Sequence, residues 1–258
     1  MMRFKLIKRK ALEQITFRLN RLLHERVFIY QGVHMKYIFL KSKQAVGNAV
    51  ILSAYSPRGI KAKYNYVRTL EEFPLNRLYI LDDFGDDKRG SYYLGKYPGF
   101  LEEKAVLELI KNTLMPDKNK MIFLGSSKGG YAAINFGLRF KNAYIISGAP
   151  QYYLRKYLQE HNPDTLNYII GSNGEGIEEL DCRLKSLINK NKNNQHIFLH
   201  FSIKEHTYLE HIVDLINDLK NQGYEIYYDV KEYEEHGEVA NYFTEVIKRQ
   251  IREILASK

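Results

Sequence analysis

The chain has 258 residues, 45% of them hydrophobic and 27% charged, and 39 Lys and Arg against 30 Asp and Glu give a net charge of +9. This composition is too apolar for a disordered protein and too poor in Gly and Pro for a fibrous one, and the length suits one large domain with a sizeable core. The single cysteine, Cys182, excludes an internal disulfide and a cysteine zinc site, which favours a cytosolic protein.

The first predicted element is a basic amphipathic helix within residues 1–26, an appendage to the main domain. Apolar residues recur there at three- and four-residue spacing, namely Phe4, Ile7, Ala11, Ile15, Leu19 and Leu22. The helix either packs on the main domain or a second subunit, or anchors the protein to anionic lipid or a partner complex. It holds eight Lys and Arg against two Glu, a net +6, which leaves only +3 for residues 27–258. The positive charge of the chain therefore belongs mostly to this helix.

From residue 27 onward, short β-rich runs alternate with helical stretches. Strands are predicted at Val27–Gly32, Tyr37–Leu40, Ala49–Ala54, Leu78–Asp82, Met121–Gly125, Ala143–Ser147, His196–Ser202 and Glu225–Val230. Helices are predicted at Tyr64–Glu72, Glu102–Leu114, Gly129–Phe140, Glu178–Asn189, Tyr208–Asn221 and Val239–Leu255. This alternation predicts an α/β fold, a three-layer sandwich whose mainly parallel sheet is covered on both faces.

Two segments depart from this alternation. The short connection Val33–Lys36 predicts that the first two strands form an antiparallel hairpin. Residues 151–175 fit no simple crossover and are interpreted as a helical insertion that caps a pocket. No apolar run approaches the roughly 18 residues of a membrane span, and the N-terminus lacks the apolar region of a secretory signal.

A Gly-x-Ser-x-Gly pattern, formed by Gly125, Ser127 and Gly129, lies between a predicted strand and a predicted helix. In that context a tight turn lifts the serine hydroxyl to the carboxyl edge of the sheet, which makes Ser127 a candidate nucleophile. The alternatives are a phosphate-binding turn or an ordinary glycine-rich loop. A Walker A loop does not fit, because the Gly-x4-Gly-Lys-[Ser/Thr] spacing is missing.

The partners of such a serine follow it in the order acid, then histidine. His236 comes directly after the last predicted strand, where a loop side chain reaches the sheet edge, and is the candidate base. Glu205 is the first carboxylate after the preceding strand and is the candidate acid, with an acidic first-turn helix residue as the alternative interpretation.

The oxyanion of an acyl transfer needs backbone donors. We expect one from the N–H of Lys128 and the other from the loop that holds Tyr55 and Ser56. The Lys128 side chain is interpreted either as a solvated charge or as an attraction for an anionic substrate. Metal sites are disfavoured, since His196 and His200 are too far apart on a strand, and the acidic loop 82–87 is expected to be a solvated turn.

Several motifs together resemble a known family. They are Ser53-Ala54-Tyr55-Ser56-Pro57, Lys63-Tyr64-Asn65-Tyr66, Arg89-Gly90-Ser91-Tyr92-Tyr93, Leu124-Gly125-Ser126-Ser127-Lys128-Gly129-Gly130, Gly148-Ala149-Pro150-Gln151 and His236-Gly237. This set resembles the α/β-hydrolase-like bacterial capsule polysaccharide O-acetyltransferases and the CpsF/XcbB-type capsule proteins. The resemblance covers roughly residues 45–250.

The resemblance implies a triad of Ser127, His236 and Glu205, with glutamate as a conservative departure from an aspartate. It implies acetyl-CoA as co-substrate, no bound cofactor and no metal, and a hydroxyl of a capsular or cell-surface polysaccharide as acceptor. It adds capsule-assembly proteins and the inner membrane surface to the partners that residues 1–26 would dock on. The residues expected to bind CoA or glycan are Arg58, Lys61, Lys63, Arg89, Lys96, Tyr92 and Tyr93.

Two other functions stay open. The same triad serves a carbohydrate esterase or deacetylase, which differs only in whether water or a sugar reaches the acyl-serine. A non-catalytic capsule assembly factor that acts through residues 1–26 is the second alternative. Nucleic acid is not an expected partner, because no recognised binding motif is present.

Overall fold

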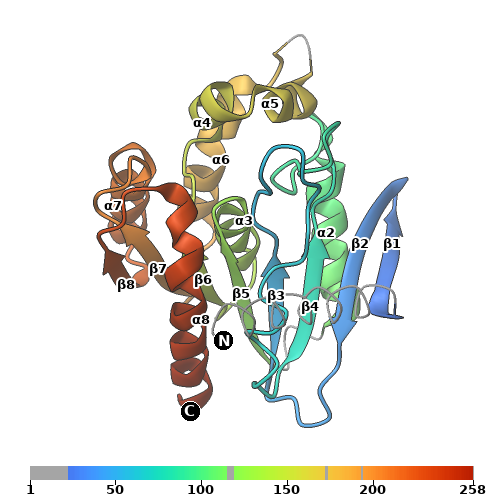
Figure 1. Ribbon diagram of the computed structural model, residues 1–258, viewed down its shortest axis with the longest axis vertical. Coiled ribbons are helices and arrows are strands. Elements are labelled where there is room, and N and C mark those ends of the chain that lie inside the picture. The colour runs from blue at the N-terminus through green and yellow to red at the C-terminus, as the bar shows by residue number, and fades with distance from the viewer. Residues whose placement is uncertain (1–22, 115–118, 172–173, 193, 258) are drawn as a thin grey trace, which may run out of the picture.

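The computed structural model describes residues 23–114, 119–171, 174–192 and 194–257 (Figure 1). The strands are β1 Glu25–Tyr30, β2 Val33–Leu40, β3 Gly47–Leu52, β4 Asn76–Leu81, β5 Lys120–Ser126, β6 Tyr144–Gly148, β7 His196–Ser202 and β8 Glu225–Lys231. The helices are α2 Leu101–Thr113, α3 Lys128–Gly137, α4 Leu154–His161, α5 Pro163–Ile170, α6 Ile177–Lys190, α7 Val213–Asn221 and α8 Val239–Ala256, with a π-turn η2 Tyr208–Ile212 and a 3₁₀ turn η3 His236–Glu238.

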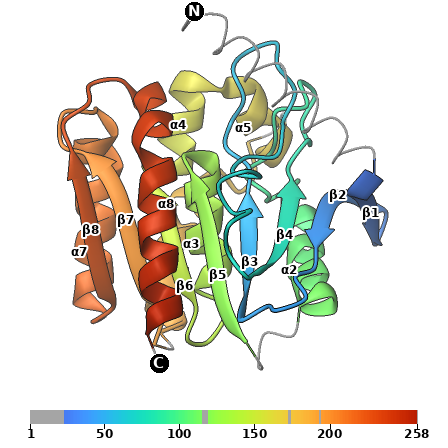
Figure 2. The ribbon, with the colours of Figure 1, turned by 60° about the horizontal axis from the view of Figure 1, so that its bottom comes forward.

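The strands form one eight-stranded sheet in the order β1-β2-β4-β3-β5-β6-β7-β8. Every pair from β4 to β8 is parallel, while β2 is antiparallel to both β1 and β4. Figure 2 shows α8 in front of the sheet, with α2, α3 and α7 behind it. Each face of the sheet accordingly has its own apolar core. The predicted three-layer α/β sandwich is confirmed.

The predicted hairpin at the start of the sheet is confirmed, but its turn is shorter than expected. β2 begins at Val33, so the connection is only Gln31 and Gly32, and the residues 33–36 belong to the strand. Both connecting residues have positive φ, 45° and 83°, as a two-residue turn of type I′ requires. The twist of that turn matches the twist of the strands it joins.

The helix predicted at Tyr64–Glu72 is wrong, because this segment consists of bends and turns. Tyr66 has a φ of 59°, which a helix does not accommodate, and the Asn65 side chain accepts a hydrogen bond of 3.0 Å from the Ala54 N–H. The Tyr66 hydroxyl lies 2.6 Å from Ser126 Oγ. The segment therefore acts as a tether to the serine turn rather than as a covering helix.

The helix predicted within residues 1–26 falls mostly outside the described residues, and its last two residues, Glu25 and Arg26, begin β1. In residues 151–175 the structure has two short helices, α4 and α5. No helix among the described residues has the length and apolarity to cross a bilayer.

Candidate active site

Ser127 lies on a sharp turn between β5 and α3. Its backbone is strained, with φ 53° and ψ −121°. A Cβ on Gly125 would lie 2.4 Å from the Gly129 carbonyl, and one on Gly129 would lie 2.4 Å from the Leu52 carbonyl. Only glycine fits at both positions. The two glycines thus bring the end of β5, the start of α3 and the end of β3 together around the serine.

Ser127, His236 and Glu205 form a hydrogen-bonded chain. His236 Nε2 lies 2.8 Å from Ser127 Oγ, and His236 Nδ1 is hydrogen-bonded to Glu205 Oε1. The same carboxylate oxygen accepts a bond of 2.7 Å from the Thr207 hydroxyl. A carboxylate at Nδ1 holds the proton on that nitrogen, which leaves Nε2 free to accept the serine proton.

Glu205 is buried, yet its environment favours the ionised form. Burial raises the pKa of this carboxyl, but the hydrogen bond and charge of His236, together with the bond from Thr207, outweigh it and hold the pKa below 4.5. Burial and the nearby Glu205 charge also raise the pKa of Tyr233, which keeps that phenol protonated. An ionised acid beside the imidazole is what a serine-activating triad needs.

The two segments expected to supply the oxyanion donors both lie next to the serine turn. The N–H of Lys128 is the first of α3, where no carbonyl precedes it within the helix to accept its hydrogen bond. The loop after β3 starts beside this turn, since an ideal Cβ on Gly129 would lie 2.4 Å from the Leu52 carbonyl oxygen. The Tyr55 ring of that loop lies 5.7 Å from the Nζ atom of the Lys128 side chain. Ser56 is buried beside it, and the Tyr55 hydroxyl is hydrogen-bonded to Thr165 of α5.

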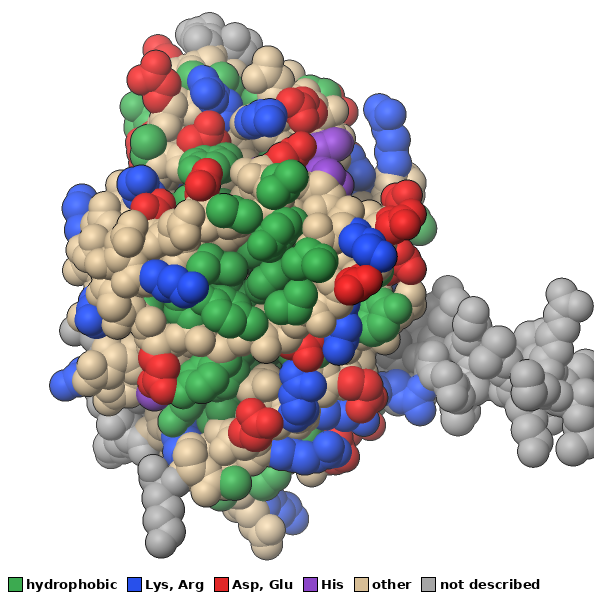
Figure 3. Space-filling view, turned by 90° about the vertical axis from the view of Figure 1, so that its left-hand side faces the viewer, with side chains coloured by type: hydrophobic (Ala, Val, Ile, Leu, Met, Phe, Trp, Pro, Cys, Tyr) green, Lys and Arg blue, Asp and Glu red, His purple; other side chains and the backbone are tan. Residues whose placement is uncertain are grey.

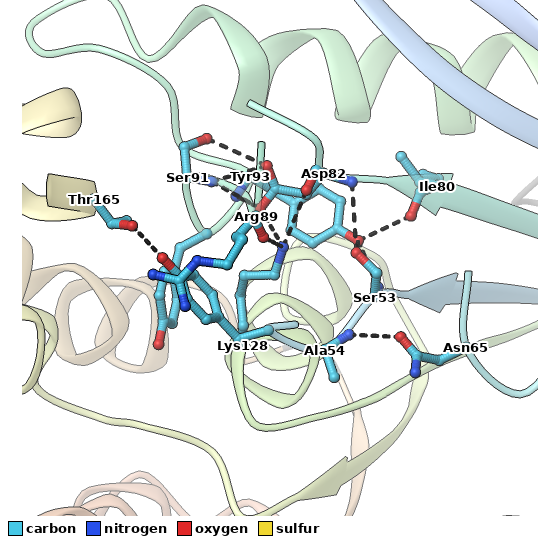
Figure 4. Close-up of polar contacts among 12 residues, drawn as sticks. Ser53, Ala54, Asn65, Ile80, Asp82, Arg89, Ser91, Tyr93, Lys128 and Thr165 are labelled. Carbon is cyan, nitrogen blue, oxygen red and sulfur yellow. Dashed lines mark hydrogen bonds and ion pairs between the residues drawn. The ribbon is translucent and has the colours of Figure 1, made fainter. Parts of the chain in front are cut away.

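The Lys128 side chain differs from both interpretations of the sequence, because it is fully buried and paired. Its ammonium lies 2.9 Å from Asp82 Oδ2 and donates to the Arg89 carbonyl at 3.0 Å (Figure 4). The carboxylate of Asp82 also accepts bonds from the backbone N–H groups of Ser91 and Tyr93. The sequence predicted that Asp82 belongs to a solvated turn, and this is wrong. Asp82 is buried and anchors the loop after β4 to the start of α3.

Two of the residues expected to bind CoA or glycan are instead used inside the protein. Arg89, 8% exposed, donates to Asp87, to the Ser56 carbonyl and to Asn162, so it joins three loops. The Tyr93 hydroxyl is 2.8 Å from Ser53 Oγ and donates to the Ile80 carbonyl at 2.9 Å. Both side chains lie below the surface because the loop after β4 folds over them.

The other expected binding residues are distributed differently. Arg58, Lys61, Lys63 and Lys96 are exposed. Lys61 lines a pocket together with His34, Lys36 and Lys88, and Asp83 lines it too, so basic groups outnumber acidic ones there. Lys96 lies 5.1 Å from the Tyr168 ring centre.

Tyr92 is buried but connects to the serine through Gln151, a residue to which the sequence assigned no role. The Tyr92 hydroxyl donates to Gln151 Oε1 at 3.2 Å, and Gln151 Nε2 lies 3.4 Å from Ser127 Oγ. Gln151 follows β6, the strand next to β5, so both residues leave the sheet at one edge. That shared edge is the signal that would have pointed to Gln151.

A row of rings leads from the triad toward α4. The centre of the His206 ring is 6.5 Å from that of His236, His161 is 5.8 Å from His206, and Tyr157 is 4.7 Å from His161. His161 is the last residue of α4, and His206 lies in the segment after β7. Within residues 23–114, 119–171, 174–192 and 194–257, no group of three or more His, Cys, Asp or Glu is arranged to hold a metal ion.

No protein-family model and no curated protein sequence matches this chain. Among solved structures it is similar to the capsule O-acetyltransferase of Neisseria meningitidis serogroup A, with a TM-score of 0.74 and 23% identity over 88% of this chain and 94% of that one. A mutant of that enzyme in complex with CoA gives the same TM-score at 22% identity.

Two further structures extend the comparison. The Glycosylation Associate Protein (Gap123) complex from Streptococcus agalactiae has a TM-score of 0.71 at 18% identity, over 89% of this chain and 46% of that one. FphF, a fluorophosphonate-binding serine hydrolase of Staphylococcus aureus, has a TM-score of 0.64 at 15% identity, over 90% of this chain and 98% of that one. The resemblance expected from the sequence is thus found in the structure, and this chain has the α/β-hydrolase fold.

Proposed function

We propose that this protein is a serine-dependent O-acetyltransferase that moves an acetyl group from acetyl-CoA to a hydroxyl of a capsular or cell-surface polysaccharide. The observation that carries the proposal is the hydrogen-bonded chain from Ser127 through His236 to Glu205. It is supported by the similarity to a capsule O-acetyltransferase over nearly the whole length of both chains.

The proposed reaction has two acyl-transfer steps. In the first, the Ser127 proton passes to His236 Nε2 while Oγ attacks the thioester carbonyl. The C–S bond breaks, and the thiolate takes the proton from His236 to leave as free CoA. In the second step, His236 accepts the proton of a sugar hydroxyl, whose oxygen attacks the acetyl-serine. The C–Oγ bond breaks and Ser127 recovers its proton, so His236 ends each step unprotonated.

The basic pocket is the proposed site for the phosphates of CoA. Lys61, Lys88 and His34 line it, and Lys36 is there held 2.5 Å from Asp83. Acetyl-CoA is the donor to test, because a mutant of the similar meningococcal capsule O-acetyltransferase is in complex with CoA. If the pocket binds the 3′-phosphate, Lys61→Ala raises KM for acetyl-CoA but leaves KM for acetyl-dephospho-CoA unchanged. The control Lys43→Ala, which changes an exposed lysine outside the pocket, changes neither.

Helices α4 and α5 are proposed to hold the acceptor and keep water out. They are tied to the loops around the serine by two contacts, from Tyr55 to Thr165 and from Arg89 to Asn162. The rings of Tyr157, His161 and His206 lie on the same side of the triad and offer flat faces and polar atoms to a sugar. Transfer exceeds hydrolysis only where the acceptor is better placed than water.

A carbohydrate esterase or deacetylase is the second candidate, favoured by the similarity to a serine hydrolase. If the protein is instead a non-catalytic assembly factor, the Ser127→Ala variant should keep the biological activity. In every case residues 1–26 are the proposed docking element, except that the last two, Glu25 and Arg26, belong to β1 of the main domain.

The test follows radiolabelled acetyl-CoA with and without capsular oligosaccharide. We expect label on the oligosaccharide, and a rapidly quenched acetyl group on Ser127 by mass spectrometry. Ser127→Ala abolishes both, whereas Ser126→Ala, the adjacent serine bonded to Tyr66, retains them. Equal acetate release with and without oligosaccharide would make the protein an esterase, and acetylation of lysines alone would contradict both enzyme functions.

A further inference from the structure

The edge strand β8 is built unlike the interior strands. All six residues of β3 are buried, whereas β8 is at the end of the sheet and pairs with β7 alone in the part of the chain that the structure describes. Its exposed residues include Tyr227, Tyr228 and Val230, at 43%, 41% and 46%. Figure 3 shows hydrophobic side chains gathered in the middle of this side of the molecule. An open edge with apolar side chains on it is a surface for strand pairing.

We propose that β8 pairs antiparallel with β8 of a second copy of this chain, about a two-fold axis at Tyr228. The reason is that the strand Glu225–Lys231 is complementary to itself in this register. Tyr228 then faces its own copy, Ile226 faces Val230, Tyr227 faces Asp229, and Glu225 faces Lys231. The proposal does not depend on the proposed enzyme function.

In this pairing the two faces of the joined strands carry different kinds of side chain. Alternate residues share a face, so Ile226, Tyr228 and Val230 meet their copies on the α7 side, where every cross-strand pair is apolar. On the α8 side, Glu225 meets Lys231 of the copy twice by symmetry. The side chains of Glu225 and Lys231 are 54% and 39% exposed. Within the chain Glu225 lies 2.8 Å from His196 and Lys231 lies 3.7 Å from Asp229, so the pair across the axis forms beside these contacts.

The opposite edge of the sheet does not have this property. The edge strand β1, with the sequence Glu-Arg-Val-Phe-Ile-Tyr, would place Arg26 opposite Ile29 and Glu25 opposite Tyr30 if it paired with itself about its centre. At β1 both charges would thus face a side chain without a counter-charge, whereas at β8 Glu225 and Lys231 face each other and only Asp229 faces a ring, that of Tyr227. This difference selects β8 as the dimer edge and a second copy as its occupant.

The full chain is tested by light scattering after size exclusion and by sedimentation over a range of concentrations. We expect a particle of twice 30.4 kDa. Tyr228→Lys, which sets two like charges against each other at the axis, should raise the dimer dissociation constant by about 30-fold. The control Ile29→Lys changes β1, where Ile29 is 63% exposed, and should leave it unchanged.

A charge swap tests the register itself. Glu225→Lys and Lys231→Glu should each raise the dissociation constant by about tenfold, and the double swap should restore it, because each residue faces the other across the axis. Circular dichroism and thermal melting confirm that each variant is folded. A wild-type monomer at all concentrations, with or without another bound protein, overturns the proposal. So does a dimer that Tyr228→Lys leaves intact, or a double swap that weakens it further.

Discussion

Among the described residues, three histidines in the carboxyl-terminal third pair with a carboxylate, namely His196 with Glu225, His200 with Asp229 and His236 with Glu205. The last two pairs are the more buried, and of these two only His236 also bonds a serine. His236 bonds Glu205 through Nδ1 and Ser127 through Nε2. His200 of β7 lies 2.8 Å from Asp229 of β8, also through Nδ1, but its Nε2 is buried and makes no hydrogen bond among the described residues.

The difference comes from where each histidine stands on the sheet. His200 lies within a strand, fully buried between the rings of Tyr233 and Phe243. His236 stands in the loop after β8 with 23% of its side chain exposed. A carboxylate alone thus orients an imidazole equally well in both places. What the loop adds is access to the serine turn and to a substrate.

Replacing His236 and His200 in turn should give the largest difference in activity between the two pairs. His236→Ala should lower kcat/KM by about 10⁴-fold or more, because the serine then has no base. His200→Asn should reduce the stability of the protein but change kcat/KM of the folded fraction only slightly. Steady-state acetyl transfer, corrected for folded protein by circular dichroism, measures both. Equal losses of activity would mean that the buried pair takes part in the reaction.

The carboxylates should differ in the same way, with a somewhat smaller effect. In Glu205→Gln an amide N–H facing Nδ1 would favour the tautomer with the proton on Nε2, which cannot accept the serine proton. We expect kcat to fall by about 10³- to 10⁴-fold. Glu205→Asp keeps the charge and should retain more activity. Asp229→Asn is the matched control, and a similar loss there would contradict the assignment.

As the pH falls, protonation of the buried histidines in the unfolded chain should lower the stability of the protein before the Glu205 carboxylate loses its stabilising effect. Burial, followed by the charges of His206 and Lys156, lowers the pKa of His211 from 6.5 to about 4. Between pH 6.5 and 4 the imidazole of His211 is therefore protonated in the unfolded chain but neutral in the folded protein. The free energy of unfolding falls as the pH falls through this range. The loss amounts to about 3 kcal/mol for this group. His200, whose pKa burial also lowers, acts in the same direction.

Urea unfolding at pH 7.5 and pH 4.5 measures this dependence, and His211→Phe should reduce the difference between the two. The carboxyls of Glu205 and Asp229 have lowered pKa values, so their stabilising effect is present above the pKa of the unfolded carboxyl and is lost only in stronger acid. An unchanged difference in the variant would show that His211 is not the group that titrates.

The positions of the candidate residues could be predicted from the sequence, because the candidate nucleophile, acid and base each follow a strand of the parallel sheet. Three strand exits therefore located Ser127, Glu205 and His236 without any knowledge of contacts. The burial of Lys128 and Asp82 was not predictable, since two charges in the sequence resemble surface groups until the loop after β4 folds over them. The irregular backbone of residues 64–72 was not predictable either, because it depends on a contact distant in sequence: Tyr66 has a positive φ and its hydroxyl lies 2.6 Å from Ser126 Oγ.

The smallest effect concerns the second contact of the serine, which has no counterpart at His200. Tyr92→Phe removes the hydroxyl that orients Gln151, whose amide lies 3.4 Å from Ser127 Oγ. A hydrogen bond of this kind contributes about 1 kcal/mol, so kcat should fall by about 3- to 10-fold with KM for acetyl-CoA unchanged. Tyr93→Phe is the control, since its hydroxyl serves Ser53 and Ile80, and it should lower the melting temperature rather than kcat. Equal kcat values for Tyr92→Phe and the wild type would mean that Gln151 holds its position without Tyr92, and that the triad alone governs the serine.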